Sequence, residues 1–118
     1  MGQFRVNLTL LARNDGPSRT IEALVDTGAA YTVVPRPVLE SLGCRPVRTQ
    51  RVVLADGRIE KWSVTQIDVE CEGRRTTTPI LMGPAEEPVL LGATTLEELG
   101  LSIDSLNRHL IPVDRHLA

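Results

Sequence analysis

The sequence predicts a small, mostly-β domain, and three observations support this fold class. Along residues 4–12 the side chains alternate between apolar and polar, which is the period of a half-buried strand. Turn-forming residues interrupt the apolar runs repeatedly, and such frequent turns are typical of a mostly-β fold. A length of 118 residues, with 42% hydrophobic and 24% charged residues, suits one packed domain and excludes two full-sized ones. We therefore expect residues 1–118 to form a single domain.

Turn signals and periodicity together place the expected elements. Residues 14–18 form a dense turn cluster that joins the first two strands into a hairpin. Pro37 and Gly43 bracket a short helix, because proline favours the first turn of a helix and glycine the position beyond its last. The dipeptide Asp56-Gly57 is favoured in tight two-residue hairpins. The expected order is strands over residues 4–12, 20–25 and 31–34, a helix over 37–42, strands over 51–55, 58–71 and 74–82, an apolar triplet at 89–91, a second helix, and short strands over 101–104 and 109–113.

The second helix is expected from a capping signal and a terminating glycine. Thr94 stands three residues before Glu97, and Thr95 stands three residues before Glu98. This is the spacing of a capping box, in which a threonine hydroxyl and a glutamate side chain satisfy backbone amides at the start of a helix. Gly100 ends the helix, because glycine readily adopts the left-handed conformation found there.

Nucleic-acid binding is disfavoured by charge and by composition. Thirteen Lys and Arg against fifteen Asp and Glu leave a formal net charge of -2 at pH 7. Only Phe4, Tyr31 and Trp62 could provide stacking platforms for bases. Trp62 lies on the expected strand 58–71, where it either lines a binding subsite or packs in the core, and we favour the core.

Cysteine and histidine usage speaks against a disulfide scaffold and against a metal site. Cys44 and Cys71 lack the close spacing of zinc ligands and are expected to be buried thiols. His109 and His116 are far in sequence from either cysteine, so we expect no metal. The chain has neither the apolar run of a signal peptide nor a transmembrane stretch, and we expect a cytoplasmic protein without a membrane partner.

One carboxylate stands where an apolar strand meets a turn. Residues 23–25 are apolar, Asp26 follows them directly, and Gly28 permits a tight backbone turn. A strand-terminating aspartate that bonds only to its own turn is common in proteins. The tripeptide Asp26-Thr27-Gly28 is therefore a weak signal when taken alone.

The neighbours of this tripeptide strengthen the signal considerably. The features in question are the turn Asp26-Thr27-Gly28, the later hairpin centred on Asp56-Gly57, and the apolar-apolar-glycine segment Leu90-Leu91-Gly92. Together they resemble the retropepsin-like aspartic proteases, and the resemblance covers residues 4–113. The helix before the hairpin and the tip Ala55-Asp56-Gly57 look more like bacterial, retrotransposon or ubiquitin-shuttle-protein members than like viral ones. The resemblance implies a closed, barrel-like, pepsin-type half-domain with two short helices that forms a homodimer.

The resemblance also implies roles for individual residues. The implied catalytic loop is Asp26, Thr27 and Gly28; the implied substrate contacts are Ala29 and Ala30 with the flap residues Ala55, Asp56 and Gly57; the implied support of the loop is Leu90, Leu91 and Gly92. Two positions depart from the family pattern. Ala93 stands where many members carry an arginine near the dimer interface, and Ala30 stands where many carry an aspartate or serine that contacts the substrate main chain.

A single Asp-Thr-Gly implies that the active site needs two chains. Peptide hydrolysis by this route requires one ionised carboxylate to take a proton from water and one protonated carboxylate to donate to the carbonyl oxygen. The chain holds no second Asp-Thr/Ser-Gly turn, so the partner carboxylate is expected to be Asp26 of a second subunit on a two-fold axis. No cofactor is required, the substrate is a peptide or protein, and activity is expected at acidic to neutral pH.

Other functions stay open beside an aspartic endopeptidase. The main alternative is a catalytically silent, protease-like module that dimerises or binds peptides without cutting them, because fold does not guarantee function. A weaker alternative is a self-association module built from the terminal segments 3–8 and 109–113, which retropepsin-like chains commonly interleave across their dimer.

Overall fold

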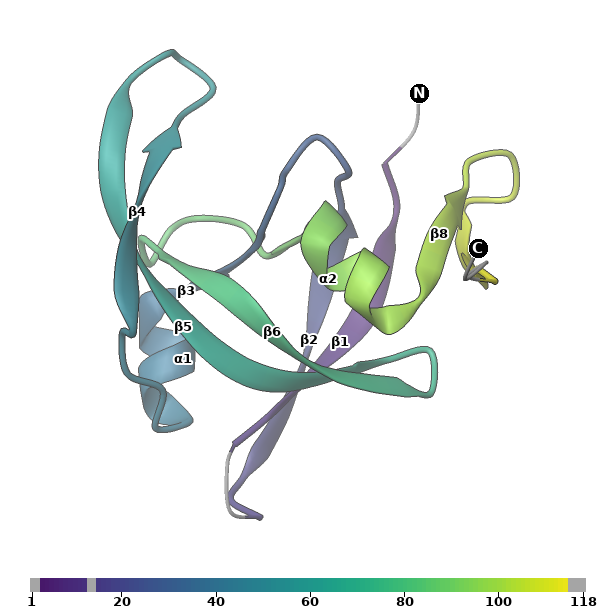
Figure 1. The fold of residues 1–118 in the computed structure, drawn as a ribbon, viewed down its shortest axis with the longest axis horizontal. Coiled ribbons are helices and arrows are strands. Elements are labelled where there is room, and N and C mark those ends of the chain that lie inside the picture. The colour runs from purple at the N-terminus through teal and green to yellow at the C-terminus, as the bar shows by residue number, and fades with distance from the viewer. Residues whose placement is uncertain (1–2, 13–14, 115–118) are drawn as a thin grey trace.

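The computed structural model describes residues 3–12 and 15–114, which contain nine strands and two short helices (Figure 1). In chain order the elements are β1 (Arg5–Leu11), β2 (Ser18–Val25), β3 (Thr32–Pro35), α1 (Arg36–Ser41), β4 (Arg48–Val53), β5 (Ile59–Cys71), β6 (Arg74–Gly83), β7 (Leu90–Leu91), α2 (Ala93–Leu99), β8 (Leu101–Asp104) and β9 (His109–Pro112). The predicted mostly-β fold class with two short helices is confirmed. Asn14 of the predicted turn cluster and His116 lie outside the described residues. Neither described helix is long and apolar enough to span a bilayer.

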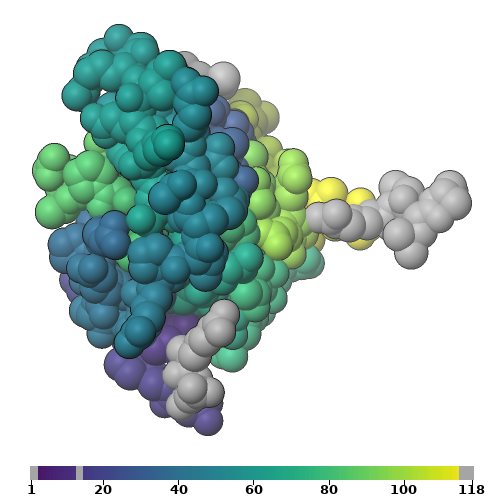
Figure 2. Space-filling model, turned by 60° about the vertical axis from the view of Figure 1, so that its left-hand side comes forward, coloured from purple at the N-terminus to yellow at the C-terminus, as the bar shows by residue number. Residues whose placement is uncertain are grey.

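Six strands close into a ring around the core. Their order is β1-β2-β7-β3-β6-β5, and β5 pairs back with β1, where residues 68–70 lie opposite residues 9–11. The pairs β2–β7 and β3–β6 are parallel, and the other pairs of the ring are antiparallel. Strand β4 pairs only with β5, so the β4–β5 hairpin extends from the ring as an arm (Figures 1 and 2). The closure is the barrel-like arrangement that the sequence predicts.

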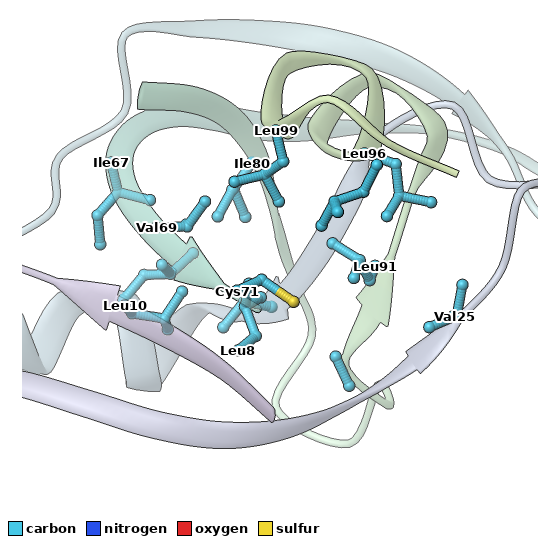
Figure 3. Close-up of a cluster of buried hydrophobic side chains, with 14 of the residues drawn as sticks. Leu8, Leu10, Val25, Ile67, Val69, Cys71, Ile80, Leu91, Leu96 and Leu99 are labelled. Atoms are coloured by element: carbon cyan, nitrogen blue, oxygen red, sulfur yellow. The ribbon is translucent and has the colours of Figure 1, made fainter. Parts of the chain in front are cut away.

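The main core fills the inside of this ring. The alternation predicted for the first strand is confirmed, because Leu8 and Leu10 of β1 are fully buried. They meet apolar side chains from the neighbouring strands and from α2, of which Figure 3 labels Val25, Ile67, Val69, Cys71, Ile80, Leu91, Leu96 and Leu99. Burial of this many large apolar side chains within one chain is the dominant favourable contribution to its folding.

The turn at the tip of the β4–β5 hairpin differs from the predicted two-residue turn. Leu54 donates its amide to the Arg58 carbonyl oxygen at 2.8 Å, and Gly57 donates its amide to the Leu54 carbonyl oxygen at 2.9 Å. The loop therefore has three residues, Ala55, Asp56 and Gly57, of which Gly57 has a φ of +88°. A three-residue loop with glycine in the left-handed conformation is the next most common hairpin closure after the two-residue turns. The prediction of the hairpin was right and that of its turn was wrong.

The capping box predicted for the second helix is also wrong. Helix α2 starts at Ala93 with Gly92 as its N-cap, and no side chain caps it. Thr94 and Thr95 therefore lie inside the helix, where Thr95 is fully buried. The predicted end is correct, because Gly100 has a φ of +71° and closes the helix in the left-handed conformation.

The two terminal strands form a small sheet of their own. Strands β8 and β9 pair with each other from Leu101 opposite Pro112 to Asp104 opposite His109. No described strand lies along the other edge of β9. At the amino-terminal end, β1 is paired with β2 along its whole length within the chain. The two terminal regions are joined where Arg108 Nη2 donates to the Gln3 carbonyl oxygen at 2.7 Å.

Cys71 is expected to be an unreactive thiol in the folded chain. Burial, reinforced by the negative charge of Glu72, raises its pKa from 9.0 to about 11. In a Cys44→Ser variant, whose only thiol is Cys71, we expect no labelling by a thiol reagent near pH 8 until the chain is unfolded, because the thiolate is the reactive form. The unfolded thiol loses its proton at a lower pH than the folded one, so stability should fall between about pH 9 and 11. Stoichiometric labelling of the folded variant at pH 8 would contradict this expectation.

Candidate active site

The predicted catalytic carboxylate lies in a tight loop at the end of β2. Asp26 donates its amide to the Leu91 carbonyl oxygen at 3.0 Å and accepts the Ala29 amide on its own carbonyl oxygen at 3.1 Å. Its carboxylate oxygen Oδ1 accepts the amide of Gly28 at 2.9 Å. Within one chain Asp26 is half-buried, and Thr27 and Gly28 are exposed. A Cβ at position 28 would lie 3.1 Å from Oδ1, so glycine keeps the space beside the carboxylate clear.

Helix α2 holds the loop from behind. Its first amide, that of Ala93, donates to the Ala29 carbonyl oxygen at 2.9 Å, and the amide of Thr94 donates to the Ala30 carbonyl oxygen at 2.9 Å. The loop backbone thus replaces the missing side-chain cap of the helix, since the first amides of any helix need acceptors from outside it. Gly92 allows this close approach, because a Cβ there would lie 2.9 Å from the Ala29 carbonyl oxygen. Position and orientation of the loop are therefore coupled to α2.

The segment Leu90-Leu91-Gly92 occupies the supporting place that the sequence predicts for it. Leu90 and Leu91 form β7, which runs parallel to β2 and opposite Val33 of β3. Leu91 is fully buried, and its carbonyl oxygen accepts the amide of Asp26. The end of β2 is in this way fixed in the sheet on the side of the catalytic loop.

A cavity of about 630 Å³ lies between the loop and the β4–β5 hairpin. Its walls are loop residues 28–31, hairpin residues 50–56 with Arg58 and Trp62, and four residues from other parts of the chain, Val33, Leu81, Glu87 and Leu90. The volume falls within the range of ligand sites in proteins. In Figure 1 the hairpin tip and the β2–β3 loop project on the same side of the barrel, and residues of both line the cavity.

A second apolar cluster, separate from the main core, forms the floor of the cavity. It consists of the buried residues Val33, Val64 and Leu81 with Tyr31, Val52, Trp62 and Leu90 packed against them. Trp62 belongs to this cluster and also lines the cavity, while its indole N–H donates to Glu60 Oε1 at 2.9 Å. Trp62 therefore packs in an apolar cluster and also lines the cavity, and its role in a substrate subsite stays a prediction.

Tyr31 joins the loop to the base of the hairpin. The guanidinium carbon of Arg48 lies 5.8 Å from the centre of the Tyr31 ring, which is within the range of a cation–π contact. Arg48 also donates to the Tyr31 hydroxyl at 3.2 Å and to Gln50 Oε1 at 2.8 Å. These contacts connect the first residues of β4 to the end of the catalytic loop.

The carboxylate of Asp56 at the hairpin tip bonds to residues of the same turn. Its carboxylate accepts the Arg58 amide at 3.0 Å and pairs with the Arg58 guanidinium at 2.6 Å. The backbone hydrogen bond and then the side-chain hydrogen bond from Arg58 lower the pKa of Asp56 below its ordinary value. Because the pair is exposed, it contributes little to stability, but it organises the tip.

The structure brings together most of the predicted substrate contacts. Ala29 and Ala30 on the loop and Ala55 and Asp56 on the hairpin line one cavity, whereas Gly57 does not. Gly57 instead provides the left-handed turn that the three-residue loop needs. Of the predicted catalytic residues only Gly28 reaches the cavity wall; Asp26 and Thr27 do not line it within one chain.

Sequence reasoning missed the apolar floor of the cavity. Val52 of β4 and Trp62 of β5 lie diagonally across the hairpin, because Val52 is opposite Glu60 and Gln50 is opposite Trp62. Both belong to the same apolar cluster as Tyr31. Partly buried Gln50 and Val52 alternate with exposed neighbours along β4, but the sequence does not reveal this face, because Gln50 is polar and the exposed Val53 is apolar. Residues such as Val33 and Leu81 gave no signal, because an apolar residue in a buried strand has the same pattern whether or not a cavity lies above it.

Comparison with known proteins agrees with this fold and site. The family model of the gag-polyprotein putative aspartyl proteases matches residues 15–98. The solution structure of Simian Foamy Virus (mac) protease has a TM-score of 0.57 at 20% identity and covers 80% of this chain and 92% of its own. EIAV protease in complex with the inhibitor HBY-793 has a TM-score of 0.66 at 21% identity and covers 84% of this chain and 89% of its own. A sequence search of curated proteins gives no match.

Fold and site together define a retropepsin-like aspartic protease domain, as the sequence resemblance implies. The family model extends over more than half of the residues and includes Asp26, the hairpin and the Leu90-Leu91-Gly92 segment. The chain belongs to the gag-polyprotein putative aspartyl protease family.

Proposed function

We propose that this chain is an aspartic endopeptidase whose active site is completed by a second copy of itself. The observation that carries the proposal is the position of Asp26 at the end of β2, in a loop that α2 holds and whose residues 28–31 line the cavity under the hairpin. The sequence contains one Asp-Thr-Gly and no second turn of this kind. One chain therefore supplies half of a carboxylate pair.

The chemistry follows from two Asp26 carboxylates on a two-fold axis. Like charges at short distance disfavour double ionisation, so the pair holds one shared proton. The ionised Asp26 takes a proton from the attacking water, and the protonated one donates to the carbonyl oxygen of the peptide bond. The amide of Gly28 donates to the Asp26 carboxylate and fixes its orientation. Loss of the shared proton at high pH should end activity.

The hairpin and the apolar floor suit an extended peptide. Hairpin residues 50–56 line the cavity along the backbone of β4, which has no described strand on its outer edge. Backbone amides and carbonyls of such a hairpin can pair with an extended substrate. The floor around Val33, Trp62 and Leu81 would receive apolar side chains of that substrate. Closure of the hairpin would exclude bulk water from the cut bond.

The free edge of β9 is the surface that best supports dimerisation. Strand β9 pairs with β8 on one side and with no described strand on the other. Ile111 of β9 is 37% exposed and Val113, just after the strand, is 43% exposed, so apolar side chains lie beside this free edge. Two β9 edges can pair across a two-fold axis. The segment 3–8 suits this role less, because β1 is already paired with β2.

Peptide-library cleavage between about pH 4 and 7, read by mass spectrometry, tests the proposal. We expect Asp26→Asn to lower kcat by roughly 10²–10⁴-fold, because the amide cannot serve as the general base. Asp15→Asn is the matched control: Asp15 is exposed in the β1–β2 turn with a φ of +57°, a conformation that asparagine also tolerates. Sedimentation of each variant must show the same dimer as wild type.

The outcomes separate the enzyme from its alternative. Cuts that vanish in Asp26→Asn and persist in Asp15→Asn support the endopeptidase. A wild-type dimer that binds library peptides and cuts none between these pH values would refute it and favour the peptide-binding module, in which Asp26 has only its role in the turn.

A further inference from the structure

A line of four hydrogen-bonded side chains crosses the molecule behind the catalytic loop. Thr32 Oγ1 of β3 lies 2.7 Å from Thr95 Oγ1 of α2, and Thr95 Oγ1 lies 3.0 Å from Thr78 Oγ1 of β6. Thr78 Oγ1 lies 2.9 Å from the carboxylate of Glu98, which is exposed at the surface. The three threonines are fully buried. At the inner end, the amide of Gly92 donates to Thr32 Oγ1 at 3.0 Å.

The chemistry of the four groups allows one direction for these bonds. Each threonine hydroxyl has a single proton to donate. An ionised Glu98 can only accept, so Thr78 donates to it and has no proton left for Thr95. Thr95 must then donate to Thr78, and Thr32 must donate to Thr95. Thr32 is left as an acceptor, and it accepts the amide of Gly92. We call these four residues the hydroxyl relay.

The relay ends at the start of α2, where the helix is hydrogen-bonded to the catalytic loop. Gly92 is the N-cap of α2, and the next two amides of the helix bind the carbonyl oxygens of Ala29 and Ala30. The residue before it, Leu91, accepts the amide of Asp26. A shift of Gly92 would therefore move acceptors and donors on both sides of Asp26 together.

Stability alone does not explain three buried hydroxyls in a row. Valine has nearly the shape of threonine, and apolar groups in all three places would bury the same volume without any need for partners. A buried polar network fixes orientation, because each member must point at the next. In this chain the orientation being fixed is that of the amide of Gly92.

We propose that Thr32, Thr95, Thr78 and Glu98 are positioning residues that set the geometry of the Asp26 loop through the amide of Gly92. The inference rests on the proposed function, since it concerns the same catalytic loop. None of the four residues lines the cavity, so each acts through the loop and not on the substrate.

The test compares Thr95→Val, which interrupts the relay, with Thr95→Ser, which keeps the hydroxyl. We expect Thr95→Val to lower kcat roughly 10- to 100-fold with little change in KM, because small misplacements of reacting groups have effects of this size. Thr95→Ser should restore most of the loss. Thr65→Val is the matched control: Thr65 is buried, and its hydroxyl donates to the Arg45 carbonyl oxygen at 2.8 Å outside the relay. It should lower the melting temperature and leave kcat near that of wild type.

Amide hydrogen exchange measured by NMR gives a readout that needs no activity. In Thr95→Val the amides of Gly92, Ala93 and Thr94 should exchange faster, while amides of the β5–β6 pair keep their protection. Unchanged exchange at these three amides, or an equal loss of kcat in Thr65→Val, would overturn the proposal. If wild type cuts no peptide, the endopeptidase fails while the exchange data still decide the relay.

Glu98 supplies a variant that does not touch the core. Glu98→Ala removes the final acceptor. We expect kcat to fall and exchange at the Gly92 amide to become faster, as in Thr95→Val, with both effects smaller than in that variant. Glu98→Gln keeps an oxygen that can accept from Thr78, so it should behave nearly as wild type. Equal behaviour of Glu98→Ala and wild type in both measurements would exclude Glu98 from the relay.

Discussion

Replacing Gly92 by alanine is expected to abolish peptide cleavage. A Cβ at this position would lie 2.5 Å from the carbonyl carbon and oxygen of Tyr31 and 2.9 Å from the Ala29 carbonyl oxygen. These are backbone atoms of the catalytic loop and its continuation, so the clash can be relieved only by moving the loop. We expect kcat/KM to fall roughly 10²-fold or more. Overpacking of this kind also costs about 1–3 kcal/mol of unfolding free energy, measurable by denaturant titration.

Gly43→Ala separates the effect on the loop from the effect on stability. Gly43 has a φ of +82°, and a Cβ there would meet no atom within 4 Å. The left-handed conformation should make alanine unfavourable by roughly 1–2 kcal/mol without any clash. We expect this variant to lose stability and keep its kcat. Full activity in Gly92→Ala would contradict the close approach of α2 to the loop.

At constant total concentration, replacing wild-type chains by Asp26→Asn chains should reduce activity by more than the fraction of chains replaced. If each active site needs Asp26 from two chains, an equal mixture at constant total concentration has about one quarter of its dimers wild type on both sides. Activity should therefore fall to about a quarter of the value for wild type alone. The measurement is the initial cleavage rate after the subunits have exchanged, plotted against the fraction of variant.

Asp15→Asn chains serve as the control in the same titration, because they change a carboxylate to an amide at the opposite end of β2 from the catalytic loop and leave Asp26 intact. Their addition should leave the initial cleavage rate unchanged. A linear decline with Asp26→Asn, to about half in the equal mixture, would mean that each chain works alone and would refute the shared dyad.

Local sequence patterns identified the helices and strands, whereas contacts between residues distant in the sequence determine where some of them begin. The alternation in β1 and the turn at Gly57 are encoded by neighbouring residues, so both hairpins could be predicted. The start of α2 could not, because the acceptors of its first amides are the carbonyl oxygens of Ala29 and Ala30, which lie more than sixty residues earlier. A capping box was the only local candidate, and the backbone of a distant loop took its place.

The same distinction holds for the site. Asp26 was recognisable because its turn is followed by the hairpin at Asp56-Gly57 and by Leu90-Leu91-Gly92, as in the retropepsin-like proteases. The strand β4 was predicted to start at residue 51, but it starts at Arg48, whose side chain contacts Tyr31 on the loop. The relay was invisible because Thr32 and Thr78 are ordinary strand residues and Thr95 was assigned to a capping box, so only the fold brings the three together.

Closure of the ring between β1 and β5 has a consequence for how such an enzyme would be controlled. Each chain closes its own ring and core, so under the proposed mechanism the half-site would already be present in a single subunit. While most subunits are single, the amount of assembled enzyme rises with the square of their concentration, as for any two-body association. Newly made chains at low abundance would be harmless to their surroundings, and proteolysis would begin only after accumulation. Expression level would then act as the trigger of proteolysis.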